Sequence, residues 1–274
     1  MTSVNTNYGA MVALQQLNQT SMELQTTQSR INTGLEVSSA RDNGAIFAIA
    51  QGMRSDVASY GVVQQSLDRT ASTVDTAVAA GEAISDLLVE MKEKALAASD
   101  DSLTATQRAA YNEDFVALRD QIGTIVSNAE FNGVNLINGT TNDVTALANT
   151  AGSGGIVVTD EDMSLGGAIV TVAAAGVLDT AANAATMIGT VSTSLANLNQ
   201  ALARLGTGSK ALEVHSNFVS KLSDAMEKGI GNLVDADMAK ESAKLQSLQT
   251  KQQLGVQALS IANQSTGIAL SFFR

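Results

Sequence analysis

Residues 45–98 read AIFAIAQGMRSDVASYGVVQQSLDRTASTVDTAVAAGEAISDLLVEMKEKALAA and decide the fold of the chain. Apolar side chains recur from Ile46 to Ala95 at alternating spacings of three and four residues, the heptad pattern of a coiled-coil seam. No proline interrupts the stretch. It therefore predicts one continuous helix, about 80 Å long at about 1.5 Å per residue. Such a length suits a rod better than a compact domain.

The same spacing appears in three other parts of the chain. One seam runs through residues 10–35, another through residues 187–233, and the last through residues 254–272. Helix caps mark the boundaries. Thr104 and Gln107 form a capping box that predicts a shorter helix ending near Asn128, and Asp235-Ala236-Asp237 offers a cap before the last helix.

Residues 139–179 have a different composition, rich in Gly, Thr and Ala, and no Lys or Arg occurs between Arg119 and Arg204. The β-branched runs at 156–159 and 168–172 are predicted to form a small hairpin around Asp160-Glu161-Asp162. The predicted fold class is therefore mainly α. It is a long helical hairpin or coiled-coil rod that folds back on itself, with a small β-hairpin excursion.

Composition argues against an enzyme. The chain has no Cys and one His, whereas nucleophilic triads and metal sites usually need these side chains. His215 lies on a helical seam, where a structural role is expected. Residues 206–210, GTGSK, lack the ending and the preceding strand of a phosphate loop. No catalytic residue, cofactor or metal site is predicted.

The charge distribution also excludes classes of partner. The net charge is −11 and belongs to the middle of the chain, which argues against nucleic acid as a partner. No apolar run is as long as a membrane span, and no secretory signal is visible, so membrane insertion is not predicted.

Both ends are nearly free of charge and rich in Asn and Gln. Residues 1–40 contain only Glu23, Arg30 and Glu36 as charged side chains, and residues 245–274 only Lys251 and Arg274. Ordering such ends costs more backbone entropy than one seam returns. They are expected to be disordered in the free chain and helical in an assembly, where neighbouring copies bury them.

Ordered motifs at both ends point to a family. The N-terminal ones are VNTN at 4–7, SRINTGL at 29–35, SSARDNGA at 38–45 and FNGVNL at 131–136. The C-terminal ones are DADMAKE at 235–241, ANQ at 262–264 and LSFFR at 270–274. In these motifs the chain resembles the bacterial flagellins, over more than two-thirds of its length.

The resemblance implies discontinuous domains built from both arms of the chain. Residues 1–40 plus 235–274 correspond to the inner-core terminal coiled-coil domain around the channel of a hollow filament. Residues 41–138 plus 180–234 correspond to the helical tube, or rod domain. Residues 139–179 form a small variable hairpin or loop on the outer side, so this resembles a short flagellin without large outer domains.

The implied function is that of a structural subunit that polymerises into the flagellar filament, outside the cell, for swimming motility. The implied partners are copies of itself and other flagellins, hook-associated and cap proteins, and an export chaperone with the type III export apparatus. The alternative is the hook–filament junction protein, a relative similar in plan. A signalling helical hairpin is a third class, but it usually has charge-rich ends and a membrane span.

Two sets of packing residues follow. The inner-core set is Ala10, Leu14, Leu17, Leu24, Ile31, Leu35, Leu254, Ala258, Ile261, Ile268 and Phe272. The rod-domain core is Ile49, Met53, Val63, Leu67, Val74, Ile84, Leu88, Met91, Leu198, Leu205, Leu212, Val219, Leu222 and Met226.

Two further sets come from the resemblance alone. A vertebrate toll-like receptor detects some flagellins through a stretch that corresponds here to Val89, Glu90, Met91, Lys92 and Glu93. Recognised flagellins carry Arg where this chain has Glu90, so weak activation is expected, although Glu90 on an exposed helix face needs no receptor to explain it. Candidate O-glycosylation sites, equally explained as a plain Thr-rich loop, are Thr140, Thr141, Thr145, Thr150, Ser153, Thr159 and Ser164.

Overall fold

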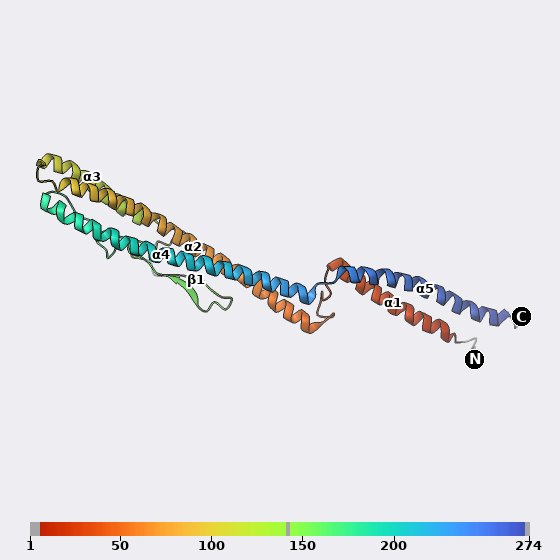
Figure 1. The fold of residues 1–274 in the computed structure, drawn as a ribbon. Coiled ribbons are helices and arrows are strands. Elements are labelled where there is room, and N and C mark those ends of the chain that lie inside the picture. The colour runs from red at the N-terminus through yellow and green to blue at the C-terminus, as the bar shows by residue number, and fades with distance from the viewer. Residues whose placement is uncertain (1–5, 141–142, 272–274) are drawn as a thin grey trace. The chain divides into compact units, whose positions relative to one another are not determined.

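The computed structural model describes the backbone of residues 6–140 and 143–271, and the side chains of these ranges as far as residue 264. The elements, in chain order, are α1 (Tyr8–Thr33), α2 (Gly44–Ala98), α3 (Ala105–Asn128), β1 (Val144–Leu147), β2 (Gly155–Val158), α4 (Ala181–Val234) and α5 (Met238–Ser271) (Figure 1). The mainly helical fold with one small hairpin is the fold predicted from the sequence.

Helix lengths and caps agree with the sequence pattern. Helix α2 has 55 residues, which confirms the single long helix expected from the uninterrupted seam. Helix α3 begins with the predicted capping box, in which the Gln107 backbone N–H donates to Thr104 Oγ1 and the Thr104 N–H donates to Gln107 Oε1. At the start of α5, Asp237 Oδ1 accepts from the N–H groups of Ala239 and Lys240, which satisfies donors that the helix itself leaves free.

The chain forms two compact units, and the boundaries between them fall inside α2 and α4. Met1–Ser55 and Asp224–Arg274 make up the first, called here the terminal unit. Asp56–Ser223 makes up the second, called here the central unit.

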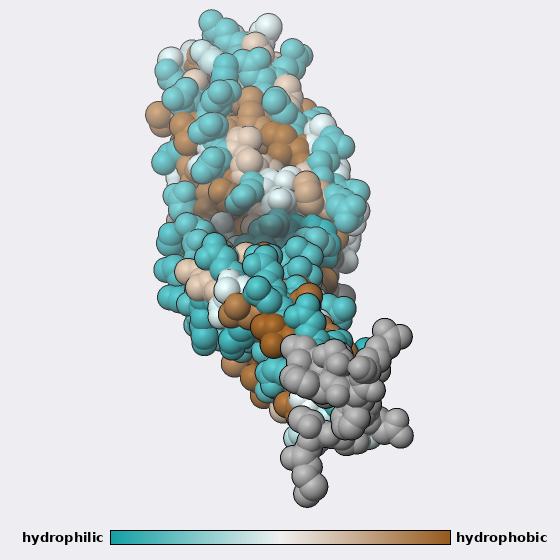
Figure 2. Space-filling model, turned by 90° about the vertical axis from the view of Figure 1, so that its right-hand side faces the viewer, coloured by the Kyte–Doolittle hydropathy of each residue, from teal (hydrophilic) through white to brown (hydrophobic). Residues whose placement is uncertain are grey.

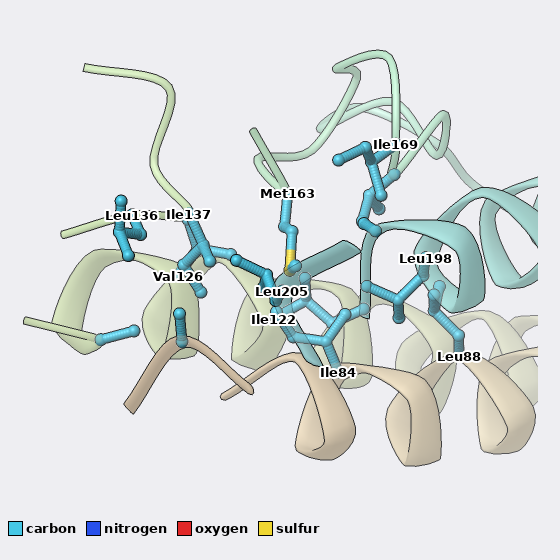
Figure 3. Close-up of a cluster of buried hydrophobic side chains, with 14 of the residues drawn as sticks. Ile84, Leu88, Ile122, Val126, Leu136, Ile137, Met163, Ile169, Leu198 and Leu205 are labelled. Atoms are coloured by element: carbon cyan, nitrogen blue, oxygen red, sulfur yellow. The ribbon is translucent and has the colours of Figure 1, made fainter. Parts of the chain in front are cut away.

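The core of the central unit lies where α2, α3 and α4 meet the loop after the hairpin. Ile84 and Leu88 of α2 pack with Ile122 of α3, Leu198 of α4 and Met163 of the loop, and all five are fully buried (Figure 3). A Cβ on Gly81 would lie 2.7 Å from Leu202 Cδ2, so the absence of a side chain at Gly81 lets the two helices approach closely.

The hairpin uses a different pair of strands from the predicted one. Strand β2 contains the predicted 156–158 run, but its antiparallel partner is β1, in the register Val144↔Val158 to Leu147↔Gly155. The prediction of a strand at 168–172 is wrong. Ile169, Val170 and Val172 are buried in the core, and the Gly166 N–H donates to the carbonyls of Val170 and Val172. The β-branched run therefore marks a buried compact loop and not a strand.

The hairpin is fixed to the helices at several points. His215 Nε2 of α4 lies 2.8 Å from the carbonyl oxygen of Ala148, so the single histidine joins a helix to the hairpin turn. The Leu147 N–H donates to Ser66 Oγ of α2 at 3.1 Å. In the turn itself, Asn149 Oδ1 accepts from the N–H groups of Ala151 and Ser153, while residues 150–154 are exposed.

The loop that follows the hairpin is held by an ion pair. Arg204 Nε and Nη2 donate to the two carboxylate oxygens of Glu161 at 2.5 and 2.6 Å. The Glu161 side chain is 7% exposed and that of Arg204 54% exposed. The hydrogen bonds to Glu161 raise the pKa of the Arg204 guanidinium above its ordinary value.

In the terminal unit, α1 and α5 pack side by side (Figure 1). Helix α1 ends at Thr33 and is capped by Gly34, whose φ of 71° is the left-handed conformation that favours glycine. The segments that follow α1 and α4 then meet, because Leu35 and Asp235 form an antiparallel bridge and the Glu36 N–H donates to the Val234 carbonyl at 2.7 Å.

Helices α1 and α5 are described in the single chain, whereas the sequence expectation that the ends become ordered only in an assembly stays a prediction. Both ends form helices in the single chain. That expectation compared the entropy of ordering the ends with the burial of a single apolar seam. It omitted the helix caps, the bridge at Leu35 and the polar cluster around Arg30 and Glu241, all of which help to hold the helices together.

Candidate functional site

The candidate functional site is the pair of terminal helices. The side of α1 that is removed from solvent repeats at alternating three- and four-residue steps. Its residues are Ala10, Ala13, Leu17, Thr20, Leu24, Thr27 and Ile31, of which Thr20 is buried and Thr27 is fully buried. Small residues and threonines alternate on this side with Leu17, Leu24 and Ile31, so small and large side chains both contribute to the packing.

The side of α5 that is removed from solvent follows the same rule. It consists of Leu245, Leu248, Gln252, Gly255, Leu259 and Ala262. A Cβ on Gly255 would lie 3.3 Å from Leu17 Cδ1, so the glycine makes room for a leucine of α1. Near the other end of the pair, Asn7 Nδ2 donates to the Ala262 carbonyl at 2.8 Å.

The predicted inner-core residues divide between the two sides of the helices. Ala10, Leu17, Leu24, Ile31 and Leu35 are half-buried in the single chain, whereas the exposed members are Leu14, Leu254, Ala258 and Ile261. Ile268 lies in α5 beyond the described side chains, and Phe272 lies outside the described residues. The sequence reasoning missed the face of α5 that packs in the chain. That face shows the same heptad spacing, so α5 has two apolar seams and only one was recognised.

The outward faces of both helices expose large apolar side chains. On α1 these are Tyr8, Met11, Val12, Leu14 and Met22, and on α5 they are Leu254, Val256 and Ile261. Leu14 is 48% exposed and Ile261 63% exposed. The exposed side of α1 forms a shallow groove of about 590 Å³. Figure 2 shows hydrophobic residues at the surface among hydrophilic ones on the face that it presents.

A second apolar surface belongs to the central unit. It is an open groove of about 860 Å³ between α4 and β2, lined by Ile156, Val214 and Phe218 among others. Val214 and Phe218 are more than half exposed. Exposed apolar surface of this kind often marks a contact with another protein.

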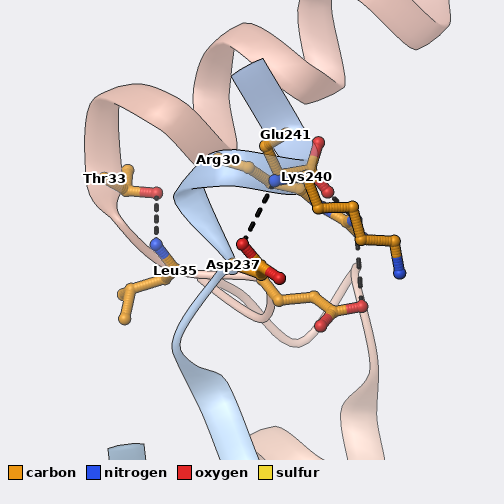
Figure 4. Close-up of polar contacts among 7 residues, drawn as sticks. Arg30, Thr33, Leu35, Asp237, Lys240 and Glu241 are labelled. Carbon is orange, nitrogen blue, oxygen red and sulfur yellow. Dashed lines mark hydrogen bonds and ion pairs between the residues drawn. The ribbon is translucent and has the colours of Figure 1, made fainter. Parts of the chain in front are cut away.

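A polar cluster joins the base of α1 to the start of α5 (Figure 4). Arg30 Nη1 lies 3.2 Å from Glu241 Oε1 and 3.8 Å from Glu36 Oε1. Glu241 is 6% exposed. Thr27 Oγ1, Arg30 Nε and Glu241 Oε2 are buried without a hydrogen-bond partner in the chain, so the cluster stays partly unsatisfied.

Asp42 organises the loop between α1 and α2. Its Oδ2 accepts from the N–H and the hydroxyl of both Ser38 and Ser39, at 2.9–3.1 Å. These bonds favour the charged form, with the Ser39 N–H contributing most, and lower the pKa of Asp42 below its ordinary value. The loop motif SSARD is therefore a turn closed by one carboxylate.

The predicted rod-domain residues lie mostly in the interior. The fully buried ones are Val63, Leu67, Val74, Ile84, Leu88, Met91, Leu198, Leu205, Leu212 and Val219. Met53, Leu222 and Met226 are half-buried, and Ile49 is 56% exposed. Ile49 belongs to the terminal unit and sits outside the core of the central unit.

In the receptor-like stretch, Val89, Glu90, Lys92 and Glu93 are exposed, whereas Met91 is fully buried. Met91 therefore supports the helix from inside and offers no surface to a partner.

The candidate glycosylation residues also differ in exposure. The exposed ones are Thr140, Thr145, Thr150, Ser153 and Thr159. Ser164 is half-buried, and its hydroxyl bonds to the Asp162 carboxylate. Thr141 lies outside the described residues.

Within the described part of the chain, no group of three or more His, Asp and Glu side chains could hold a metal ion. Among the helices of those residues, none is both long and apolar enough to cross a membrane.

Comparison with known proteins accounts for the paired ends and the long central helices. The model of the bacterial flagellin N-terminal helical region matches residues 4–142, and that of the C-terminal helical region matches residues 188–273. The chain belongs to the bacterial flagellin family. Flagellins FljK and FljM of Caulobacter vibrioides are each 55% identical to this flagellin over 274 residues, covering 100% of this chain and 99% of theirs.

A solved structure has the same fold. The crystal structure of Bacillus cereus flagellin aligns with a TM-score of 0.51 at 23% identity, covering 56% of this chain and 88% of that one. Because both family models and the full-length relatives are flagellins, this flagellin is a structural subunit of the flagellar filament, as the sequence predicted. Full-length identity to flagellins favours this function over that of a hook–filament junction protein.

Proposed function

We propose that this flagellin polymerises by burying the outward apolar faces of α1 and α5 against other copies. The observation that carries the proposal is the exposure of Leu14 on α1 and of Leu254 and Ile261 on α5, in helices with very few charges. Exposing such side chains to water is unfavourable by about 1.5–3 kcal/mol each relative to full burial. A single chain offers no cover for them, whereas a filament does.

Amide side chains make the same faces suitable for burial. Gln15, Asn18 and Gln19 line the α1 groove together with the apolar residues. Amides can hydrogen-bond between helices without the cost of burying a charge. The small number of charges on α1 and on residues 245–271 of α5 thus permits neighbours on several sides.

The contact is inferred to be heterologous, because the apolar faces of α1 and α5 are not copies of one surface. Head-to-tail contacts that do not close generate an open helical filament. In that filament residues 1–40 plus 235–274 form the inner core around the channel, residues 41–138 plus 180–234 form the surrounding tube, and residues 139–179 lie on the outer side. The groove at Val214 and Phe218 supports further contacts between tubes.

The partners follow from this role. The subunit leaves the cell through the type III export apparatus, held beforehand by a chaperone on its C-terminal arm, and works outside the cell. The exposed apolar face of α5 is a surface that such a chaperone can cover. In the filament the subunit contacts copies of itself, other flagellins, and hook-associated and cap proteins. Neither nucleic acid nor membrane insertion belongs to this role, and the role is structural rather than enzymatic.

Two properties depend on the surface of the central unit. Exposed Glu90 places a negative charge within the receptor-like stretch, so activation of the toll-like receptor is weak. Glycans, if attached to the outer segment, occupy the exposed hydroxyls of Thr145, Thr150, Ser153 and Thr159 in preference to Ser164, whose hydroxyl already bonds to Asp162.

The assembly proposal is tested by removing residues 254–274 and, separately, by L254Q/I261Q. Both substituted positions are exposed, so the point variant leaves the packing between α1 and α5 intact. We expect both proteins to remain soluble and helical by circular dichroism but to form no filaments on seeds of sheared wild-type filament. V157Q, at an exposed site on the hairpin, is the matched control and polymerises normally. Filaments from the truncated protein would overturn the proposal.

A further inference from the structure

Two methionines lie in the apolar groove of α1. Met11 is 63% exposed and Met22 62% exposed, and both line the groove with Tyr8, Val12 and Leu14. Eleven residues separate them, which is close to three helical turns. Their thioethers therefore lie on the same side of α1, about 16 Å apart along the helix axis.

The other described methionines are better protected. Met91 and Met163 are fully buried in the core of the central unit. Met238, at the start of α5, is 44% exposed but does not line the groove. Because susceptibility of methionine to oxidants follows exposure, Met11 and Met22 are, among the methionines that the structure describes, the sites expected to react first in the free subunit.

We propose that Met11 and Met22 form an oxidation site that governs whether a free subunit can assemble. Oxidation of both thioethers by a peroxide blocks polymerisation, and polymerisation in turn shields them from peroxide. The inference rests on the proposed function, because it assumes that neighbouring copies cover the α1 groove.

The chemistry needs only hydrogen peroxide as co-reactant. A lone pair of the methionine sulfur attacks one peroxide oxygen, the O–O bond breaks and an S–O bond forms. The sulfur is oxidised by two electrons and the peroxide is reduced. The second oxygen leaves as hydroxide, which takes up the proton lost by the sulfur-bound oxygen and becomes water. The product is a sulfoxide, which is polar where the thioether was apolar.

The consequence for assembly follows from desolvation. A sulfoxide oxygen in water accepts hydrogen bonds, but the apolar side chains at the groove provide no donors when a neighbour covers it. The amides of Gln15, Asn18 and Gln19 lie in the same groove and could donate to a sulfoxide. In the filament, however, the same amides are the groups that hydrogen-bond to amide side chains of neighbouring copies. Two sulfoxides on one face therefore weaken addition of a subunit at the filament end.

The test compares wild type, M11L/M22L and M238L. Leucine preserves apolar character and nearly preserves volume, so M11L/M22L is expected to fold, and the treated rate of each protein is compared with its own untreated rate. Each monomer is treated with hydrogen peroxide, the sulfoxides are mapped by peptide mass spectrometry, and polymerisation on filament seeds is followed. We expect treated wild type and M238L to elongate seeds about tenfold more slowly or worse, while M11L/M22L keeps its untreated rate. Methionine sulfoxide reductases with a thiol reductant should restore the treated wild type.

A second measurement treats assembled filaments. Met11 and Met22 should then oxidise about tenfold more slowly or less than in the monomer. The inference is overturned if doubly oxidised monomers polymerise at the untreated rate, if treated M11L/M22L loses polymerisation like wild type, or if Met11 and Met22 react equally fast in filament and monomer. Failure of the proposed function looks different: L254Q/I261Q would polymerise normally, whatever the oxidation state of the methionines.

Discussion

Arg30 and Glu241 stand 211 positions apart in the chain, yet Arg30 Nη1 lies 3.2 Å from Glu241 Oε1. This pair joins the end of α1 to the first turn of α5, so it links the two arms of the flagellin. The carboxylate has little access to water, since the Glu241 side chain is only 8% exposed. An acidic side chain in the first turn also interacts favourably with the helix dipole.

Removing Arg30 should loosen the terminal unit. R30M leaves the Glu241 carboxylate buried without its cation, which costs about 3–5 kcal/mol when a buried pair is broken from one side. Hydrogen exchange of the α1 and α5 amides measures the effect, and protection should fall in both helices while the central unit keeps its protection. R69M, at an exposed position of α2, is the control. Unchanged exchange in R30M would show that the pair adds nothing to the pairing of the helices.

Gly81 should be intolerant of a side chain. G81A places a Cβ 2.7 Å from Leu202 Cδ2 and 3.4 Å from Met163 Cε, so the Leu202 side chain or helix α4 must shift. We expect a loss of about 1–3 kcal/mol in the free energy of unfolding, measured by urea titration. G61A is the matched control in the same helix, because nothing lies within 4 Å of its Cβ. It should be neutral or stabilising by up to about 1 kcal/mol. Equal behaviour of the two variants would contradict the packing described here.

The ion pair between Arg204 and Glu161 should matter more than the one between Lys210 and Glu213. R204M leaves a buried carboxylate without its guanidinium, with an expected cost of about 2 kcal/mol, less than for a fully buried pair because Arg204 is half exposed. Lys210 and Glu213 are both largely exposed, so K210M should change stability by less than about 0.5 kcal/mol. Thermal unfolding of both variants checks the order, and a larger effect of K210M would refute it.

The loop closed by Asp42 should respond to acid. Its pKa is lowered in the folded chain, so its contribution is fully present above the ordinary aspartate pKa of about 3.9. That contribution is lost as the pH falls through the lowered folded value. D42N should therefore abolish amide protection of residues 38–42 at neutral pH, and acidification should do so only below about pH 4 in the wild type. D86N, at an exposed carboxylate of α2, should leave the loop unchanged.

Receptor activation should depend on the sign of the charge at position 90. E90R converts an exposed acid within the receptor-like stretch into a base and should raise signalling about tenfold or more in reporter cells. E82R, on the same helix outside the stretch, is the control for a general change of charge. Strong activation by the wild type would contradict the expectation.

The sequence predicted the helices far better than the contacts between distant segments. Periodicity and caps located α2, α3 and the start of α5, because these features depend on neighbours in the chain. Strand β1 was missed since its partner is chosen by tertiary packing, and the β-branched run at 168–172 serves the core instead. Helix α5 shows the same difficulty: it has two seams, and spacing alone does not say which one faces α1.

Some parts of the candidate site had no local signal. The pairing of Arg30 with Glu241 joins opposite arms of the chain, and nothing in the spacing near either residue indicates it. The link from His215 to the carbonyl of Ala148 is similar, since the residue type suggested only a structural role and the partner is a backbone group. The exposure of Met11 and Met22 likewise depends on which side of α1 packs against α5.

The hairpin turn has a practical consequence for protein engineering. Strands β1 and β2 close at Leu147↔Gly155, and the exposed residues 150–154 lie beyond that last pair. Extra residues inserted there lengthen an exposed tip and leave the paired strands and the link at His215 in place. Each subunit could then carry a foreign peptide, and a filament would present that peptide in many regularly spaced copies, as a vaccine carrier or a scaffold for immobilised enzymes requires.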